Sequence, residues 1–274
     1  MLGKCLDNVR ASAPLVHCIT NYVTVNDCAN ILIACGASPI MADDPDEAAD
    51  ITSICSALVV NIGTLNRNTI PSMFSAGKKA AALGHPVLLD PVGAGASALR
   101  TDTAAKLLKE VRFTAVRGNI SEIKALCSGQ GGAKGVDADV ADAVTDAALP
   151  DAVSFAKRFA KDTGAVIIIT GAIDIAADAE RAWVLSNGCP MMAKITGSGC
   201  MLSAMLGAYL AANPDSPLEA SAACLGAMGI AGELAEARRQ AADAGNSTFR
   251  NLLIDEIYKL DGAALDRMAR YEIR

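Results

Sequence analysis

Large aromatic side chains and histidines are scarce in this chain of 274 residues. The sequence contains one Trp, four Tyr, five Phe and two His, although 52% of its residues are hydrophobic. Glycine is frequent, with 23 residues, and alanine is abundant. A core built from small and aliphatic side chains favours closely packed helices against a sheet over a core filled by large rings.

Excess positive charge and long apolar runs are also missing. The formal net charge is −6, and acidic and basic residues alternate along the chain, so no basic face for nucleic acid is expected. No uninterrupted apolar run approaches the length of a membrane span, and the first ten residues lack the apolar core of a secretory signal. These features predict a cytoplasmic protein that binds neither nucleic acid nor membrane.

Patterned cysteines are absent as well. The nine cysteines are an odd number, are scattered among apolar neighbours and include no C-x-x-C pair. Disulfide frameworks and zinc sites need closer, patterned spacing, so most of these thiols are predicted to be free and buried. Cys200 differs from the others because it directly follows a Gly-x-Gly turn. Neither a Walker A motif nor a G-x-G-x-x-G dinucleotide motif occurs, which argues against a P-loop NTPase and a Rossmann dehydrogenase.

Short apolar segments alternate with helical segments along most of the chain, the pattern of a parallel sheet covered on both faces. No linker, charge block or internal repeat interrupts it, so we expect one α/β domain over residues 1–274. Strands are predicted at 15–22, 38–42, 57–62, 86–90, 113–116 and 166–170. Helices are predicted at 25–34, after 43–47, at 73–83, 103–111, after 117–122, at 153–162, after Cys200, at 217–239 and from 247 or 248 to 260.

Two segments depart from this alternation. Residues 174–185 and 191–195 are predicted to form an antiparallel pair, because Asn187-Gly188 between them is a hairpin signal. Residues 128–149 are rich in Gly, Ala and Asp and indicate a loop with a short helix. That loop is either a flap that closes over a ligand or a plain surface loop.

A glycine-rich turn leads directly into an apolar helix at residues 194–204. Gly197 and Gly199 flank Ser198 and allow a ligand to approach the backbone closely. The free N–H groups at such a helix start could bind an anion such as phosphate. The alternative is a tight turn with a serine cap.

Polar side chains are predicted at the carboxyl ends of several strands, which meet at one edge of a parallel sheet where ligands bind. They are Asn21, Met41, Asn61, Asp90, Arg117, Glu122 and Thr170, together with the turn at Gly197. Carboxylates, an arginine and an anion-binding turn suit a Mg-nucleotide. Taken singly, Asp90 could be a turn former, Glu122 a first-turn helix charge and Arg117 a surface cation. His17 is interpreted as a hydrogen-bonded structural residue rather than a catalytic one.

Five segments carry a resemblance to a known family: 16–22 (VHCITNY), 36–42 (GASPIMA), 89–94 (LDPVGA), 117–122 (RGNISE) and 196–200 (TGSGC). In this order and spacing, they resemble the hydroxyethylthiazole kinase family of thiamine salvage. That family belongs to the ribokinase-like superfamily, whose fold is a three-layer sandwich. The resemblance extends from about Pro14 to the last predicted helix.

The resemblance implies transfer of phosphate from ATP to the alcohol of 4-methyl-5-(2-hydroxyethyl)thiazole, with Mg²⁺, in a homotrimer whose active sites lie between subunits. The residues that match family motifs fall into four groups. Met41, Gly197 and Asn21 are expected to bind the thiazole, Arg117, Thr170, Asn119 and Gly199 to bind ATP, Asp90 and Glu122 to hold Mg²⁺, and Cys200 to act in catalysis.

Cys200 stands where the wider superfamily usually carries Asp. An ordinary thiol has a pKa of about 8.5 and is a poor base at neutral pH. We therefore expect Cys200 to orient or weakly activate the substrate hydroxyl while the amides of 197–200 stabilise the transferring phosphoryl group. Other possible functions are a ribokinase-like kinase for a hydroxymethylpyrimidine, an ADP-forming dehydratase of related fold, and a nucleotide-binding sensor without catalysis.

Overall fold

The computed structural model describes residues 2–129 and 147–274, and all nine strands in these ranges form one sheet. Its order is β2-β1-β3-β4-β5-β6-β7-β8-β9. The strands are β1 Leu15–Ile19, β2 Ser38–Ile40, β3 Ala57–Asn61, β4 Val87–Asp90, β5 Ala115–Gly118, β6 Val166–Ile169, β7 Asp174–Ala177, β8 Ala182–Leu185 and β9 Tyr271–Ile273. Strands β1 to β6 pair in parallel, and β7, β8 and β9 continue the sheet in antiparallel pairs.

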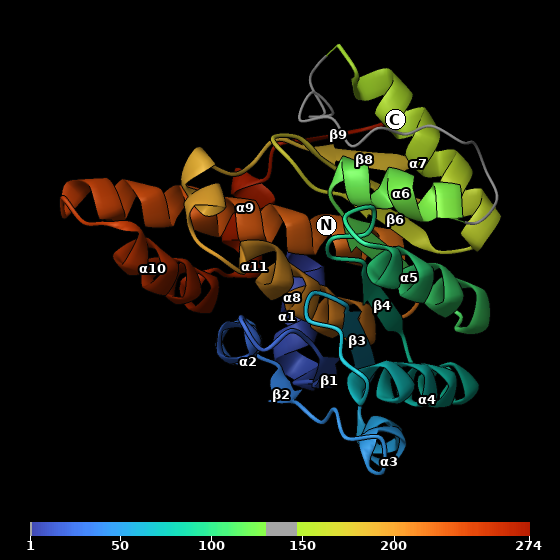
Figure 1. The fold of residues 1–274 in the computed structure, drawn as a ribbon. Helices are drawn as coiled ribbons and strands as arrows, with labels where there is room; N and C mark the ends of the chain where they lie inside the picture. Colours follow the sequence, from blue (N-terminus) through green and yellow to red (C-terminus); the bar gives the residue numbers. More distant parts are fainter. Residues whose placement is uncertain (1, 130–146) are drawn as a thin grey trace.

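Helices cover both faces of the sheet (Figure 1). They are α1 Leu2–Ser12, α2 Val25–Cys35, α3 Ala48–Ile54, α4 Thr69–Leu83, α5 Ala98–Glu110, α6 Ile120–Gly129, α7 Leu149–Thr163, the 3-10 helix η1 Pro190–Lys194, α8 Ser198–Ala212, α9 Pro217–Ala241, α10 Asn246–Lys259 and α11 Gly262–Met268. One hydrophobic core lies under α1, α2 and α8 to α11, and a second lies under α3 to α7. The predicted three-layer α/β architecture is confirmed.

Alternate residues of each central strand enter the two cores, as the pleat of a strand requires. In β3, Val59 belongs to the core under α8 and α9, whereas Leu58 and Val60 belong to the core under α4 and α5. Both sets of side chains are buried, which is why the parallel strands consist of continuous apolar residues.

Several predicted elements are shifted or missing. Strand β5 runs two residues further than predicted, so that Arg117 and Gly118 belong to the strand. The predicted pairing of 174–185 with 191–195 is wrong. The antiparallel pair is β7 with β8, and its turn is closed by the carboxylate of Asp178, which accepts the backbone N–H groups of Glu180 and Arg181 at 2.8 and 2.6 Å.

The ends of the chain contain elements that the sequence patterns did not predict. Helix α1 packs against α8, α9 and α11, and β9 adds the edge strand of the sheet. Helix α10 begins at Asn246, one or two residues before the predicted cap. The loop predicted at residues 128–149, either a flap or a plain surface loop, falls largely on residues 130–146, which lie outside the described residues.

Helix α9 is long and apolar enough, by length and composition, to cross a membrane, in contrast to the expectation from uninterrupted apolar runs. Within the structure, 83% of its most apolar window is buried, and the helix packs against α8, α10 and the sheet. We interpret α9 as a core helix. All nine cysteines are free, as predicted.

Candidate active site at the carboxyl edge of the sheet

Asp90 lies at the centre of a polar network at the carboxyl ends of the parallel strands. It ends β4, pairs with Asn61 of β3 in the sheet register, and has no exposed surface. Its Oδ2 accepts hydrogen bonds from Asn61 Nδ2 at 2.7 Å and from Ser203 Oγ at 2.8 Å. Its Oδ1 is buried, has no hydrogen-bond partner among the described residues and lies 3.7 Å from Nη1 of Arg117.

The environment of Asp90 makes its charged form costly. Burial raises the pKa of Asp90 to about 6, and Arg117 opposes that rise while Glu122 adds to it. An orphaned carboxylate oxygen deep in a protein is rare, since buried polar atoms almost always have partners. This oxygen is therefore suited to bind a cation or a ligand group supplied from outside the chain.

Cys200 joins the same network from the first turn of α8. Its Sγ accepts N–H groups from the side-chain amides of Asn21 at 3.1 Å and Asn61 at 3.3 Å. Burial raises the pKa of Cys200, and the charge of Asp90 raises it further. The thiol is consequently protonated at neutral pH and can act as a hydrogen-bonding group, but it is a poor proton acceptor.

The start of α8 carries free backbone N–H groups, as the glycine-rich turn predicted. The N-cap residue is Gly197, whose φ of +87° is a left-handed conformation that favours glycine, and it has no side-chain cap. Met201 is the first residue whose N–H bonds back to the turn, at 2.8 Å from Gly197 O. Among the described residues, no acceptor occupies the amides of Ser198, Gly199 and Cys200. The alternative of a serine cap is not supported.

Arg117 lies directly beside this helix start. Its Nη2 donates to the hydroxyl of Thr170 at 2.6 Å, which fixes the guanidinium at the ends of β5 and β6. A Cβ atom on Gly199 would lie only 2.6 Å from Nη1 of Arg117. Gly199 is helical, so it is needed for space rather than for backbone freedom. The free amides and the guanidinium together form a concentrated anion-binding region.

Glu122 connects the loop after β4 with the start of α6. Its two oxygens accept the backbone N–H groups of Gly93 and Asn119, each at 2.9 Å. The Asn119 side chain accepts the N–H of Glu122 at 2.8 Å in return. This reciprocal cap holds Glu122 at the same sheet edge as Asp90.

A cavity of about 570 Å³ opens next to Arg117 on the side of β6. All four predicted ATP-binding residues line it, namely Arg117, Asn119, Thr170 and Gly199. The rest of its wall comes from the turn between β6 and β7, the loop after β8, η1, the first turns of α8, and Met228 and Gly229 of α9. A volume of this size suits a small organic ligand.

Asp174 also lines this cavity, and sequence reasoning missed it. Burial raises its pKa to about 7, opposed by a hydrogen bond from the N–H of Gly171 and by the charge of Arg117. It begins β7, and its pattern in the sequence was that of an ordinary strand residue. Only the antiparallel turn of β7 after β6 brings it back toward Arg117.

Met41 and His17 lie outside the hydrogen-bond network of Asp90 and Cys200. Met41 follows β2 at the edge of the sheet and packs against the core, but no described contact joins it to Cys200. His17 is buried, with Nδ1 2.8 Å from Thr52 Oγ1 and Nε2 2.7 Å from the carbonyl of Ala42. Burial lowers the pKa of His17, so the ring is neutral. These bonds agree with a structural role.

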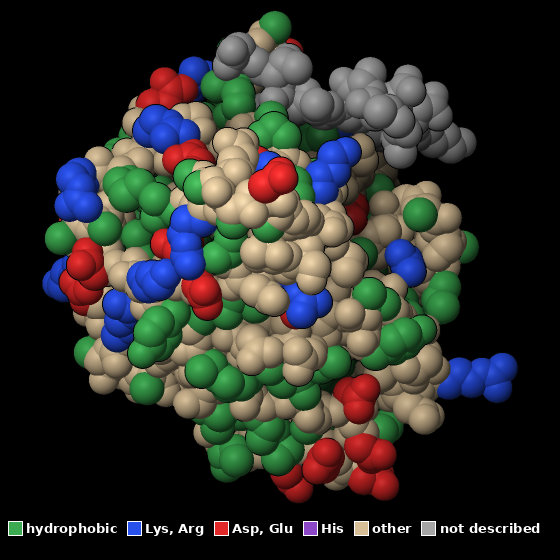
Figure 2. All heavy atoms as spheres, turned by 90° about the vertical axis from the view of Figure 1, so that its left-hand side faces the viewer, with side chains coloured by type: hydrophobic (Ala, Val, Ile, Leu, Met, Phe, Trp, Pro, Cys, Tyr) green, Lys and Arg blue, Asp and Glu red, His purple; other side chains and the backbone are tan. Residues whose placement is uncertain are grey.

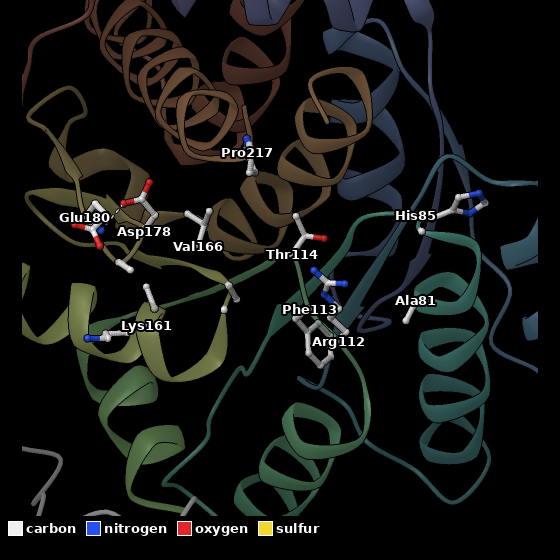
Figure 3. Close-up of a pocket in the computed structure, with 15 residues that line it drawn as sticks. Ala81, His85, Arg112, Phe113, Thr114, Lys161, Val166, Asp178, Glu180 and Pro217 are labelled. Atoms are coloured by element: carbon white, nitrogen blue, oxygen red, sulfur yellow. Dashed lines mark hydrogen bonds between the residues drawn. The ribbon is translucent and has the colours of Figure 1, made fainter. Parts of the chain in front are cut away.

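A second cavity, also of about 570 Å³, lies at the opposite edge of the sheet (Figure 3). Arg112 and Lys161 bring positive charge to it, whereas Asp178 and Glu180 bring negative charge. None of the predicted site residues lines it. Because its charges are mixed and Asp178 already accepts backbone N–H groups, it has no chemistry comparable to that around Asp90.

Comparisons with known proteins identify the family to which the chain belongs. The chain is 64% identical to a hydroxyethylthiazole kinase of Clostridium acetobutylicum over 99% of both chains. A solved hydroxyethylthiazole kinase from Pyrococcus horikoshii superposes with a TM-score of 0.87 at 33% identity, covering 100% of this chain and 98% of the other. A pyridoxal kinase of Staphylococcus aureus, solved with ADP, has a TM-score of 0.57 at 19% identity over 80% of this chain and 87% of the other, which supports the fold alone. The sequence model of the hydroxyethylthiazole kinase family matches residues 6–263, and the chain belongs to that family.

Proposed function

We propose that this kinase transfers the terminal phosphoryl group of ATP to the hydroxyl of 4-methyl-5-(2-hydroxyethyl)thiazole at the edge where β4, β5 and β6 end. The observation that carries the proposal is the group of free amides at the start of α8 beside the guanidinium of Arg117 and the orphaned oxygen of Asp90. Phosphoryl transfer depends mainly on positioning and on neutralising charge, and these groups supply both.

The nucleotide is proposed to extend from the start of α8 into the cavity beside Arg117. The amides of Ser198, Gly199 and Cys200 would receive the terminal phosphate, since anions are stabilised at a helix N-terminus. Arg117 and Thr170 would bind phosphate oxygens, and Asn119 would lie along the nucleotide. The apolar part of the cavity, between η1 and Met228, would receive the base.

Asp90 and Glu122 are the residues proposed to hold Mg²⁺, directly or through water. Within residues 2–129 and 147–274, no cluster of three or more His, Cys, Asp or Glu side chains forms a metal site by itself. Magnesium fits this arrangement, because it commonly binds through one or two carboxylates together with waters and phosphate oxygens. Once bound, the ion would neutralise charge on the phosphates. The orphaned Oδ1 of Asp90 is the atom of this chain best suited to it.

The thiazole alcohol is proposed to lie on the other side of Cys200, against Asn21, Gly197 and Met41. Because burial keeps the Cys200 thiol protonated, its role would be to orient the hydroxyl by hydrogen bonding. Asn21 and Asn61 hold the sulfur in place from β1 and β3. The hydroxyl proton would then leave late, after the phosphoryl group has begun to transfer, and would pass to an oxygen of that group or to solvent.

We further propose a homotrimer in which a neighbouring subunit completes this thiazole pocket, in a cytoplasmic setting that the nine free cysteines support. Tyr22 and Val23 directly follow Asn21 and have exposed fractions of 75% and 58%. Large apolar side chains so exposed beside a site often mark an interface. In Figure 2, hydrophobic side chains gather in the lower half of the face shown, above an acidic cluster at its lower end.

Turnover by the purified protein tests the proposed reaction. Incubated with the thiazole alcohol, ATP and Mg²⁺, it should release ADP and form the thiazole phosphate, detected by mass spectrometry. A hydroxymethylpyrimidine in place of the thiazole tests the alternative ribokinase-like activity, and a reaction without acceptor measures background ATP hydrolysis. Phosphorylation of the pyrimidine alone would overturn the assignment, and nucleotide binding without turnover would favour a sensor.

A further inference from the structure

The loop after β8 forms one wall of the proposed nucleotide cavity, and a single glutamate of α9 holds it there. Asn187, Gly188 and Cys189 line the cavity. The N–H of Gly188 donates to Glu233 Oε1 at 2.7 Å, and the side-chain amide of Asn187 lies 3.4 Å from both Glu233 oxygens. The position of this wall therefore depends on where the Glu233 carboxylate points.

Arg270 holds that carboxylate from the C-terminal segment. Its Nη2 donates to Glu233 Oε1 at 2.5 Å and its Nη1 to Oε2 at 3.1 Å, which is a two-pronged contact. Burial alone would raise the pKa of Glu233, but the hydrogen bonds from Arg270 and Gly188 outweigh it and lower the pKa. The carboxylate is thus ionised and held at neutral pH.

Arg270 also binds the loop directly. Nη2 donates to the carbonyl of Ser186 at 3.0 Å, and the backbone N–H of Arg270 donates to Asn187 Oδ1 at 2.7 Å. The Asn187 amide in turn donates to the carbonyl of Met268 at 3.2 Å. The start of the loop wall is therefore bonded to the end of α11 and to Arg270, which follows it.

The surface of α9 is shaped to accept this loop. A Cβ atom on Gly229 would lie 2.7 Å from the backbone of Asn187, so a side chain there would push the loop away from the helix. The side chain of Asn187 is buried, with 6% of the residue exposed. Because the loop packs so closely on α9, it is held in one position as long as its hydrogen bonds remain intact.

We infer that the Glu233–Arg270 pair is a positioning device that presets the nucleotide cavity and thereby sets the affinity of the enzyme for its nucleotide. This inference rests on the proposed nucleotide site. The family sequence model ends at residue 263, so the device uses a residue beyond the matched region. A half-exposed ion pair contributes little to the stability of the fold. Its effect comes from ordering the loop before the ligand arrives, which lowers the cost of binding.

Arg270→Ala is the variant that tests the inference. The dissociation constant for ADP, measured by calorimetry without acceptor, and the KM for ATP should each rise by about 5- to 20-fold. The kcat and the KM for the thiazole alcohol should stay within about twofold, because the hydrogen bonds and the ion pair described for Asp90 and Cys200 come from other residues than the loop. Arg270→Lys keeps the charge but not the planar fork, so it should recover only part of the affinity.

Arg181→Ala is the matched control. Arg181 pairs with Glu219 of the same helix α9 at 2.9 Å, and its side chain is 50% exposed, compared with 55% for Arg270. It lies in the β7–β8 turn, at the other edge of the sheet from the nucleotide cavity. Losing this ion pair should leave the ADP dissociation constant unchanged.

The outcomes separate this inference from the proposed function. If the wild-type chain binds ADP and Arg270→Ala binds it equally well, the positioning role is wrong while the nucleotide site stands. An equal loss in Arg181→Ala, or a parallel rise in both KM values with a lowered melting temperature, would show a merely structural role. If the wild-type chain itself fails to bind ADP, the proposed nucleotide site is wrong.

Discussion

One oxygen of the Asp90 carboxylate accepts two hydrogen bonds, and the other has no partner among the described residues. We therefore expect that removing the charge of Asp90 lowers activity but raises the stability of the free protein. Asp90→Asn retains a side chain of the same shape beside Asn61 and Ser203 but cannot carry charge. We expect kcat to fall by about 100-fold or more, because the Mg²⁺ that would neutralise the phosphates loses its proposed carboxylate ligand. The Mg²⁺ dependence of kcat should also shift to higher concentrations, and an unchanged Mg²⁺ titration would remove Asp90 from the metal site.

The same variant should stabilise the free protein at neutral pH. The pKa of Asp90 is about 6 in the fold, compared with the ordinary value of 3.8. Between these values the folded chain binds more protons than the unfolded chain, so the free energy of unfolding falls as pH rises through this window. Above pH 6, Asp90→Asn should therefore be more stable than the wild type by about 1–3 kcal/mol. Urea unfolding at pH 4 and pH 7 without Mg²⁺ measures this, and equal differences at both pH values would contradict it.

Cys200 is predicted to position the acceptor rather than to remove its proton. Because its thiol is protonated, Cys200→Ala should lose no more than about 10-fold in kcat. Cys200→Asp should keep or raise the rate, since a carboxylate can both orient and accept. The pH profile of kcat/KM for the three proteins is the measurement. A much larger loss in the folded Ala variant, with a pH profile that shows the wild-type thiol acting as a base, would contradict the positioning role.

At the scale of elements, the contact between α8 and β5 depends on the missing side chain of Gly199. In Gly199→Ala, the new methyl group would meet the guanidinium of Arg117 and turn it away from the amides of the helix start. We expect the KM for ATP to rise by about 10-fold with little change in melting temperature. Gly245→Ala, where a Cβ meets nothing within 4 Å, is the control. Unchanged KM in both variants would separate Arg117 from nucleotide binding.

The strand ends were the part of the site that sequence could locate. Asn21, Asp90 and Thr170 each follow an apolar run, and parallel pairing necessarily places such ends at one edge. The free amides of α8 could be predicted from Gly197 because the turn conformation is local. For the same reason the helix ends at Gly36 and Gly84, both with positive φ, were predicted.

Features that depend on distant contacts could not be predicted in this way. Asn187-Gly188 has the composition of a hairpin turn. Hydrogen bonds to Glu233 and Arg270 instead hold these two residues in the loop after β8. Strand β9 has only three residues, and it forms because it pairs with β8 at the sheet edge. Asp174 reaches the cavity only through the reversal of β7. In each case the deciding partner lies far away in sequence, so no local pattern marks it.

At the scale of the whole molecule, the proposed trimer predicts a concentration-dependent activity. Sedimentation equilibrium should give three times the chain mass of 28.1 kDa. Val23→Asp would place a charge in the proposed interface and should dissociate the assembly. The KM for the thiazole alcohol should then rise while ADP binding persists. Leu99→Asp, at an exposed apolar position on α5, is the control. A monomeric wild type with full activity would contradict the shared site.

The only tryptophan of the chain, Trp183, lies in β8 and provides an intrinsic fluorescence probe. Trp183 is 1% exposed, and its ring centre lies 4.7 Å from that of Tyr271 in β9. Its indole N–H has no hydrogen-bond partner in the part of the chain that the structure describes. Selective excitation of the indole therefore reports on a buried position where β9 pairs with β8, four residues before Asn187. The wavelength and the quenching of its fluorescence emission therefore measure how stably β9 pairs with β8, independently of any turnover assay.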